Sequence, residues 1–320
     1  MIRGFLLFVL TVAPAVPVAP AWAQQPAKVP VVGVLTTHVA VNDPLYDTLR
    51  AGLRELGYEE GRNIRIEIVT AAGQVDRLPA LAQDFVRNKV DIIIATNELS
   101  VRTAKKATTV IPIVMSCCGY DPVASGFIDS FSHPGGNITG LYSLPAELDT
   151  KRLEILKETL PGVTRVAVFW EDPFGRSALE ALNRAAPTLG VRLDLIQIHG
   201  QQDLETAFKA AKQKKDGAVL LVWSPTFFAH RDRIAALASK ARLPAVAAFA
   251  GALVSYGGDV NAAFKRVAYY VDRLLKGAKP GELPVEQVAI FRLVVNLKTA
   301  KALGLTIPQS ILLRADEVIR

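Results

Sequence analysis

The feature that most constrains the fold is an order of strands and helices that occurs twice along the chain. In its first half, short β-branched runs at 30–35, 64–68 and 91–95 alternate with amphipathic segments at 46–56 and 78–85. Such runs are typical of buried parallel strands, and apolar residues at helical spacing between them indicate crossover helices. This β-α-β-α-β order predicts a parallel sheet with helices on both faces.

The same order returns after residue 160. Apolar runs at 165–170, 193–198 and 216–222 read as strands, with helical patterns at 178–189 and 204–212 between them. The second half is therefore expected to form a sheet of the same kind.

Landmark residues keep their spacing between the two halves. Gly57 and Gly190 each follow a helix, and Pro112 and Pro244 each lie in a later strand; the two intervals agree to within one residue. We therefore expect an α/β protein of two doubly wound parallel-sheet lobes, which suits a chain of 320 residues.

Two such lobes facing one another form a cleft, because ligands of open parallel sheets bind beyond the carboxyl ends of the strands. The candidate ligand-binding residues are those in the loops after the strands. In the first lobe they are Thr37, His38, Thr96, Asn97, Ser100, Cys117 and Asp121; in the second they are Trp170, Glu171, Phe174, Trp223, Ser224 and Phe249. The first set is mainly polar and the second mainly aromatic, which suits a ligand with a polar head and a flat or apolar body.

Each of these residues also has a purely structural interpretation. Thr96 and Ser100 lie where a helix follows a strand, so they hold a ligand carboxylate or only cap their own helix. Of Glu171 and Asp172, one is expected to accept a hydrogen bond from a ligand amine or hydroxyl and the other to cap a helix; the alternative is that both are solvated. His38 approaches the ligand or faces solvent.

The aromatic candidates have the same two interpretations. Trp170 and Trp223 end corresponding strands, which favours the cleft over the core for both. The glycine pair at 134–137 resembles a phosphate loop but lacks its spacing, so a tight turn is the better interpretation.

The first 23 residues have the features of an export signal. Arg3 supplies the positive charge, residues 5–10 an apolar core, and Ala21-Trp22-Ala23 the cleavage site. A membrane anchor is the alternative, but the prolines in this segment oppose a spanning helix. We expect cleavage after Ala23 and, because no cysteine adjoins that point, a lipid-free protein in the periplasm.

Charge and cysteine content exclude other classes. The net charge is +7, spread without a basic cluster, so no nucleic-acid partner is expected. Cys117 and Cys118 are adjacent, and we interpret them as two small buried residues; a strained bridge between them is the alternative. The four histidines stand far apart in the sequence, and no metal or cofactor motif is present, so neither metal nor cofactor is expected.

Motifs along the whole chain resemble those of the ABC-transporter substrate-binding proteins of the tryptophan or aromatic-amino-acid type, which have the type I periplasmic-binding fold. They are ELGY at 55–58, GRN at 61–63, DPV at 121–123, PGGNITG at 134–140, SYG at 255–257, LKGAKP at 275–280, LPVE at 283–286 and NLKTAKALG at 296–304. The resemblance implies a Venus-flytrap receptor that delivers a small organic solute to a permease in the inner membrane.

The resemblance also implies a hinge of three crossovers, near Thr139, Gly257 and Val288. Lobe 1 would then comprise 29–140 with 258–287, and lobe 2 would comprise 141–257 with 288–320. The family's pattern adds Ser177 to the ligand-facing loop after Trp170. Because that loop reads WEDPFG here, where amino-acid-binding members usually carry Asn-Ser or Glu-x-x-Ser, the identity of the ligand does not carry over.

We therefore expect a monomeric importer receptor that performs no chemistry. A periplasmic sensor that reports ligand occupancy to a signalling partner is the alternative. No catalytic constellation supports an enzyme, and nothing resembling a helix-turn-helix precedes the first strand, which excludes a repressor.

Overall fold

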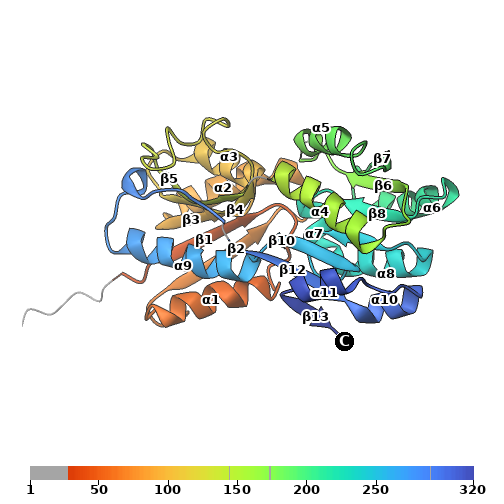
Figure 1. The fold of residues 1–320 in the computed structure, drawn as a ribbon. Helices are drawn as coiled ribbons and strands as arrows, with labels where there is room; N and C mark the ends of the chain where they lie inside the picture. The colour runs from red at the N-terminus through yellow and green to blue at the C-terminus, as the bar shows by residue number, and fades with distance from the viewer. Residues whose placement is uncertain (1–27, 144, 173, 289) are drawn as a thin grey trace, which may run out of the picture.

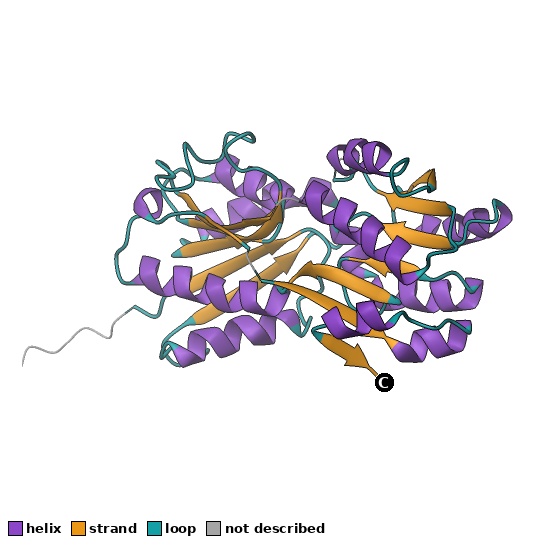
Figure 2. Cartoon of the chain, in the orientation of Figure 1, coloured by secondary structure: helices purple, strands orange, loops and turns teal. Residues whose placement is uncertain are grey.

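A computed structural model describes residues 28–143, 145–172, 174–288 and 290–320. Two lobes lie side by side, and each is an open twisted sheet with helices on both faces (Figures 1 and 2). The expected fold class, two doubly wound lobes joined by three crossovers, is confirmed.

The first lobe has a sheet of six parallel strands in the order β11-β5-β4-β3-β1-β2. The strands are β1 (Val31–Thr36), β2 (Arg65–Thr70), β3 (Ile92–Ala95), β4 (Ile113–Gly119), β5 (Ile138–Ser143) and β11 (Glu286–Gln287). Its helices are α1 (Leu45–Glu55), α2 (Leu78–Arg87), α3 (Glu98–Ala107) and α9 (Val260–Leu275). Helices α2 and α3 cover one face, whereas α1 and α9 cover the other, so the lobe has a hydrophobic core on each side of its sheet.

The second lobe has a sheet of seven strands in the order β13-β12-β10-β9-β8-β6-β7. The strands are β6 (Arg165–Trp170), β7 (Arg192–Gln197), β8 (Ala218–Leu221), β9 (Ala245–Ala247), β10 (Val254–Gly258), β12 (Phe291–Asn296) and β13 (Glu317–Ile319). Its helices are α4 (Pro145–Thr159), α5 (Arg176–Ala185), α6 (Leu204–Gln213), α7 (Pro225–Ala229), α8 (Arg231–Ala241), α10 (Leu297–Leu303) and α11 (Gln309–Arg314). Short 3-10 turns occur at Val75–Arg77, Gln201–Asp203 and Pro280–Glu282. All its neighbouring strands are parallel except β10 and β12, which are antiparallel.

The chain passes between the two sheets after β5, between β10 and α9, and between β11 and β12. Strand β5 stays in the first sheet as far as Ser143, so the first passage lies a few residues beyond Thr139. The two lobes thus contain segments from both halves of the chain: α9 and β11 belong to the first lobe, and the last strands and helices extend the second.

Gly140 shows how closely β5 approaches its neighbour. Its φ is +118°, and a Cβ atom at this position would lie 2.3 Å from the carbonyl oxygen of Met115 in β4. Only glycine fits such an approach, which gives a physical reason for the glycine that ends the 134–140 motif.

The predicted export signal lies outside the described residues and stays a prediction. Along the part of the chain that is described, no helix is both long and apolar enough to cross a membrane.

Candidate functional site

A cavity lies between the lobes where the strands of both sheets end. We call it the central cavity, and its lining residues are Val39, Leu45, Tyr46, Thr96, Asn97, Ser116, Trp223, Pro225, Phe228, Val260 and Phe264. None of these side chains is charged, and aromatic rings come from both lobes. The central cavity has a volume of about 70 Å³, and its lining suits a flat, uncharged part of a ligand.

Two hydroxyl groups in the wall of the central cavity are buried without partners. Tyr46 is fully buried and Ser116 nearly so, and neither hydroxyl makes a hydrogen bond of good geometry with a described residue, although the Thr36 hydroxyl is close enough to Tyr46 to oppose the rise of its pKa. Burial raises the pKa of Tyr46 well above its usual value, so the phenol stays protonated and can donate. Unpaired buried hydroxyls favour a ligand that brings a neutral hydrogen-bonding group.

A second cavity adjoins the first toward the β2 and β7 edges of the sheets. This outer cavity has a volume of about 610 Å³. Its lining residues are His38, Ala72, Gly73, Gln74, Val75, Leu99, Glu171, Asp172, Phe174, His199, Gly200, Gln201, Gln202, Thr226 and His230. Histidines that stand far apart in the sequence thus meet around one buried carboxylate, that of Glu171.

Glu171 is joined to the opposite lobe through a threonine. The Thr226 hydroxyl donates to Glu171 Oε1 at 2.8 Å and lies 3.2 Å from His38 Nε2. Because Thr226 gives its only proton to Glu171, it must accept from His38, which places the proton of neutral His38 on Nε2. Glu171 Oε2 and His38 Nδ1 are buried and have no partner within the described chain.

Burial dominates the electrostatics of this group. It raises the pKa of Glu171, and the hydroxyls of Thr226 and Ser224 oppose that rise. Burial also lowers the pKa of His38 to about 4, helped by the charge of His230. At neutral pH His38 is therefore uncharged, and Glu171 lacks a cationic partner at hydrogen-bonding distance.

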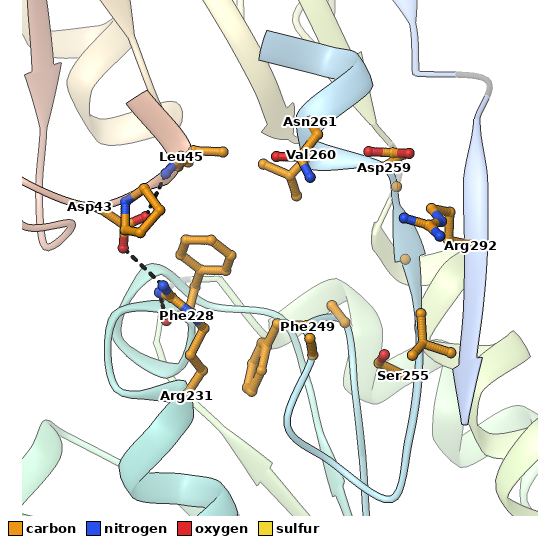
Figure 3. Close-up of a pocket in the computed structure, with 16 residues that line it drawn as sticks. Asp43, Leu45, Phe228, Arg231, Phe249, Ser255, Asp259, Val260, Asn261 and Arg292 are labelled. Atoms are coloured by element: carbon orange, nitrogen blue, oxygen red, sulfur yellow. Dashed lines mark hydrogen bonds and ion pairs between the residues drawn. The ribbon is translucent and has the colours of Figure 1, made fainter. Parts of the chain in front are cut away.

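A third cavity lies on the hinge side, with a volume of about 290 Å³. Figure 3 shows the ring of Phe228 and the guanidinium of Arg231 facing Asp43 and Leu45 at the start of α1, with the ring of Phe249 deeper on the lobe 2 side. We call it the hinge cavity, because Gly257 and Gly258 of β10 also line it.

The structure distributes the residues predicted from the sequence over these cavities. Thr96, Asn97 and Trp223 line the central cavity; His38, Glu171 and Phe174 line the outer cavity; Phe249 lines the hinge cavity.

Other predicted residues support the cavity wall from behind. Asn97 caps α3 by accepting from the Ser100 amide at 3.0 Å, and it donates to the Thr37 hydroxyl at 2.8 Å. Ser224 caps α7 by accepting from the Phe227 amide at 3.1 Å. Thr37, Ser100 and Ser224 are fully buried, so their role in this structure is to hold the loops that bear the cavity residues.

The remaining predicted residues lie elsewhere. Trp170 packs against the lobe 2 core and lines none of these three cavities. Asp121 accepts from the amides of the next turn, and Ser177 is exposed on α5. The side chain of Cys117 lies outside the described residues.

Asp172 does not cap α5, as one of the two acidic residues was expected to do. It is exposed and pairs with Arg176, with Oδ1 2.5 Å from Nε, while Gly175 precedes the helix without a side-chain cap. That pair lowers the pKa of Asp172, whereas its neighbour Glu171 is buried. The two adjacent side chains therefore point apart, and their carboxylates have different environments.

The sequence did not single out several cavity residues. Tyr46 and Phe264 lie in segments whose apolar residues recur at helical spacing, which is typical of core residues, and Thr226, Phe228 and Arg231 carry no motif. Among the described residues no group of three or more histidine, cysteine, aspartate or glutamate side chains is arranged to hold a metal ion.

Comparison with known proteins decides the family. The family model described as ABC transporter substrate binding protein matches residues 28–319. The chain belongs to this family. One relative of this substrate-binding protein is the tyrosine-binding protein of Clostridioides difficile (strain R20291), 25% identical over 279 residues that cover 83% of this chain and 79% of the relative.

Solved structures share the whole fold. A conserved domain protein from Vibrio cholerae has a TM-score of 0.80 at 28% identity and covers 91% of this chain and 100% of its own. An ABC domain from Streptococcus pneumonia in complex with L-Trp has a TM-score of 0.79 at 22% identity, over 91% of this chain and 99% of its own. A ligand-free, open substrate binding protein with adhesive properties from Clostridium difficile matches at the same identity and coverage, but with a TM-score of 0.63.

Proposed function

We propose that the protein is the periplasmic component of an ABC importer, which binds an amino-acid-like aromatic solute between its lobes and delivers it to a membrane permease. The observation that carries the proposal is the pairing of an uncharged, aromatic-lined central cavity with an outer cavity that contains one buried carboxylate, which has no cationic partner at hydrogen-bonding distance among the described residues. An aromatic amino acid has a group that matches each cavity, an aromatic side chain for the first and an ammonium group for the second. The names of two relatives, a tyrosine-binding protein and an L-Trp-bound domain, support this ligand class.

Each part of the solute has residues suited to it. Trp223, Phe228 and Phe264 offer ring faces and edges to its aromatic body. Glu171 Oε2 is buried and has no partner among the described residues, so it accepts a hydrogen bond from the ammonium group of the solute. The positive charge of that group keeps the Glu171 carboxylate ionised, although burial raises the pKa of Glu171. Tyr46 and Ser116 offer hydroxyls to a polar substituent on the ring.

A thermal-shift screen against amino acids, aromatic acids, amides and nucleosides tests the ligand class. A solute present at 100 times its dissociation constant adds about 2.7 kcal/mol to the free energy of unfolding, which such a screen detects readily. Stabilisation by aromatic acids that lack an amine, and not by aromatic amino acids, would contradict the role given to Glu171.

A matched pair of variants tests that role directly. Glu171→Gln keeps the shape of the side chain and removes its charge, so we expect affinity for an aromatic amino acid to fall at least about tenfold in calorimetric titration. Glu205→Gln is the control, because this carboxylate lines none of the three cavities and is paired with Lys209 on the surface of lobe 2. Equal losses in the two variants would count against a specific contact with Glu171.

A further inference from the structure

The two lobes are joined across the cleft by one ion pair among the residues that the structure describes. Arg231 Nη2 of lobe 2 lies 3.0 Å from Asp43 Oδ2 of lobe 1 (Figure 3). The other ion pairs between described residues lie within a single lobe. Both side chains are largely shielded from water, with 24% of Arg231 and 10% of Asp43 exposed.

Each partner is held in place by its own lobe. The Arg231 guanidinium lies 4.8 Å from the centre of the Phe228 ring, and its Nη1 donates to the Phe228 carbonyl at 3.0 Å. Asp43 Oδ1 accepts from the Leu45 amide at 2.9 Å at the start of α1, which leaves Oδ2 for Arg231. Little side-chain entropy is lost when the two meet, because both are ordered before the lobes close.

The same segment of lobe 2 makes further contacts across the cleft. Phe228 packs against hydrophobic clusters of both lobes, and Thr226 reaches His38. Arg231 and Asp43 line the hinge cavity but not the central or the outer cavity, so they do not touch the proposed solute positions themselves, although their neighbours Phe228 and Leu45 line the central cavity.

We propose that Asp43 and Arg231 form a latch that is made only when the lobes close, and that this pair sets how long a solute is retained without touching it. The proposal rests on the proposed function, in which a solute binds between the lobes. Opening separates the pair and returns both charges to water, so the bond stabilises the closed state selectively. Asp43 and Arg231 are thus positioning residues, acting through closure on a site that other residues form.

The structure offers variants that remove the latch and leave each lobe intact. Asp43→Asn keeps an oxygen for the Leu45 amide, and Arg231→Met keeps an apolar stem over Phe228. With L-tyrosine and L-tryptophan as probes, we expect each variant to raise the dissociation rate roughly three- to tenfold, as loss of a partly buried charge pair acts mainly on that rate. The double variant should be no faster than the quicker single one.

The control is Lys265→Gln, which breaks an exposed pair with Glu55 inside lobe 1 and should leave the rate unchanged. Small-angle scattering without solute gives a second readout, because loss of the latch should raise the radius of gyration by favouring open molecules. Unchanged dissociation rates, or additive effects in the double variant, would overturn the latch.

The two proposals fail in different ways. If neither amino acid binds the natural protein, the proposed ligand class is wrong, and scattering alone decides the latch: an unchanged radius in both single variants rejects it. If both amino acids bind and the variants release them at the natural rate, the function stands and the latch does not.

Discussion

A buried ion pair in lobe 2 gives the sharpest test of how this fold is held together. Asp149 and Arg152 lie on α4, and their side chains are 0% and 2% exposed. Arg152 Nη1 donates to Asp149, and its Nε donates to the Tyr256 carbonyl of β10 at 2.6 Å. Burial raises the pKa of Asp149 although Arg152 and the Trp223 amide oppose the rise. The pair therefore costs more in desolvation than its own attraction returns, and each charge is tolerated because the other is present.

This balance predicts non-additive effects on stability. Asp149→Asn leaves a buried guanidinium without a counter-charge, and Arg152→Met leaves a buried carboxylate, so each should lower the free energy of unfolding by about 3–5 kcal/mol. The double variant lacks both charges and loses mainly the bond to Tyr256, so we expect it to cost only about 1–3 kcal/mol. Adding Asp149→Asn to Arg152→Met should thus restore stability.

Urea unfolding followed by far-ultraviolet circular dichroism measures the three variants. A matched arm at pH 5 adds a second criterion. In Arg152→Met the isolated Asp149 has a raised pKa, so the folded state binds a proton more tightly than the unfolded state does and the variant should lose less stability at pH 5 than at pH 8. A double variant whose cost equals the sum of the single costs would refute the reasoning.

Three further predictions follow from individual residues. Burial raises the pKa of Asp216 from 3.8 to about 6, so the folded state binds the proton more tightly than the unfolded state, and the protein loses stability as the pH rises from 3.8 to about 6. Asp216→Asn should therefore raise the unfolding temperature at pH 8 but not below pH 4. A gain in unfolding temperature that is independent of pH would contradict this. A solute that closes the cleft should change tryptophan emission in Trp170→Phe but not in Trp223→Phe, because Trp223 alone of the two lines the central cavity; the reverse pattern would place the solute elsewhere. Gly140→Ala should cost at least about 2 kcal/mol in urea unfolding, whereas Gly136→Ala, which meets no atom within 4 Å, should be nearly neutral; similar costs would argue against the close approach.

The order of elements could be predicted from the sequence because it depends on local patterns. Short β-branched runs gave strands β1, β3, β6 and β8, and the helical spacing between them gave the crossover helices. Boundaries were less certain: the helix expected over 178–189 ends at Ala185, since the residues up to Gly190 form turns. Cooperative features such as the antiparallel pairing of β10 with β12 depend on distant segments and left no local signal.

The two tryptophans show why the site was harder to predict than the fold. Trp170 is the last residue of β6, on the same face as Val166 and Val168, and that face packs in the lobe 2 core. Trp223 lies two residues beyond Leu221, the last residue of β8. Leu221 faces the opposite side of the sheet and belongs to the other core cluster of lobe 2. Because side chains alternate across a strand, two residues at corresponding strand ends can face opposite sides of the sheet.

The division of the site between the lobes also depends on chain topology. Lobe 1 was expected to supply polar groups and lobe 2 aromatic ones, yet Tyr46 and Phe264 bring rings from lobe 1 and Glu171 brings the buried carboxylate from lobe 2. Phe264 arrives because the chain returns to lobe 1 directly after hinge strand β10, so the first turns of α9 lie at the cleft. The Asp259 side chain caps that helix by accepting from the Ala262 amide at 3.0 Å, and the Asp259 amide donates to the Ile290 carbonyl at 2.8 Å. We therefore expect a bend at this hinge to move one wall of the central cavity directly, because no loop separates β10 from the start of α9.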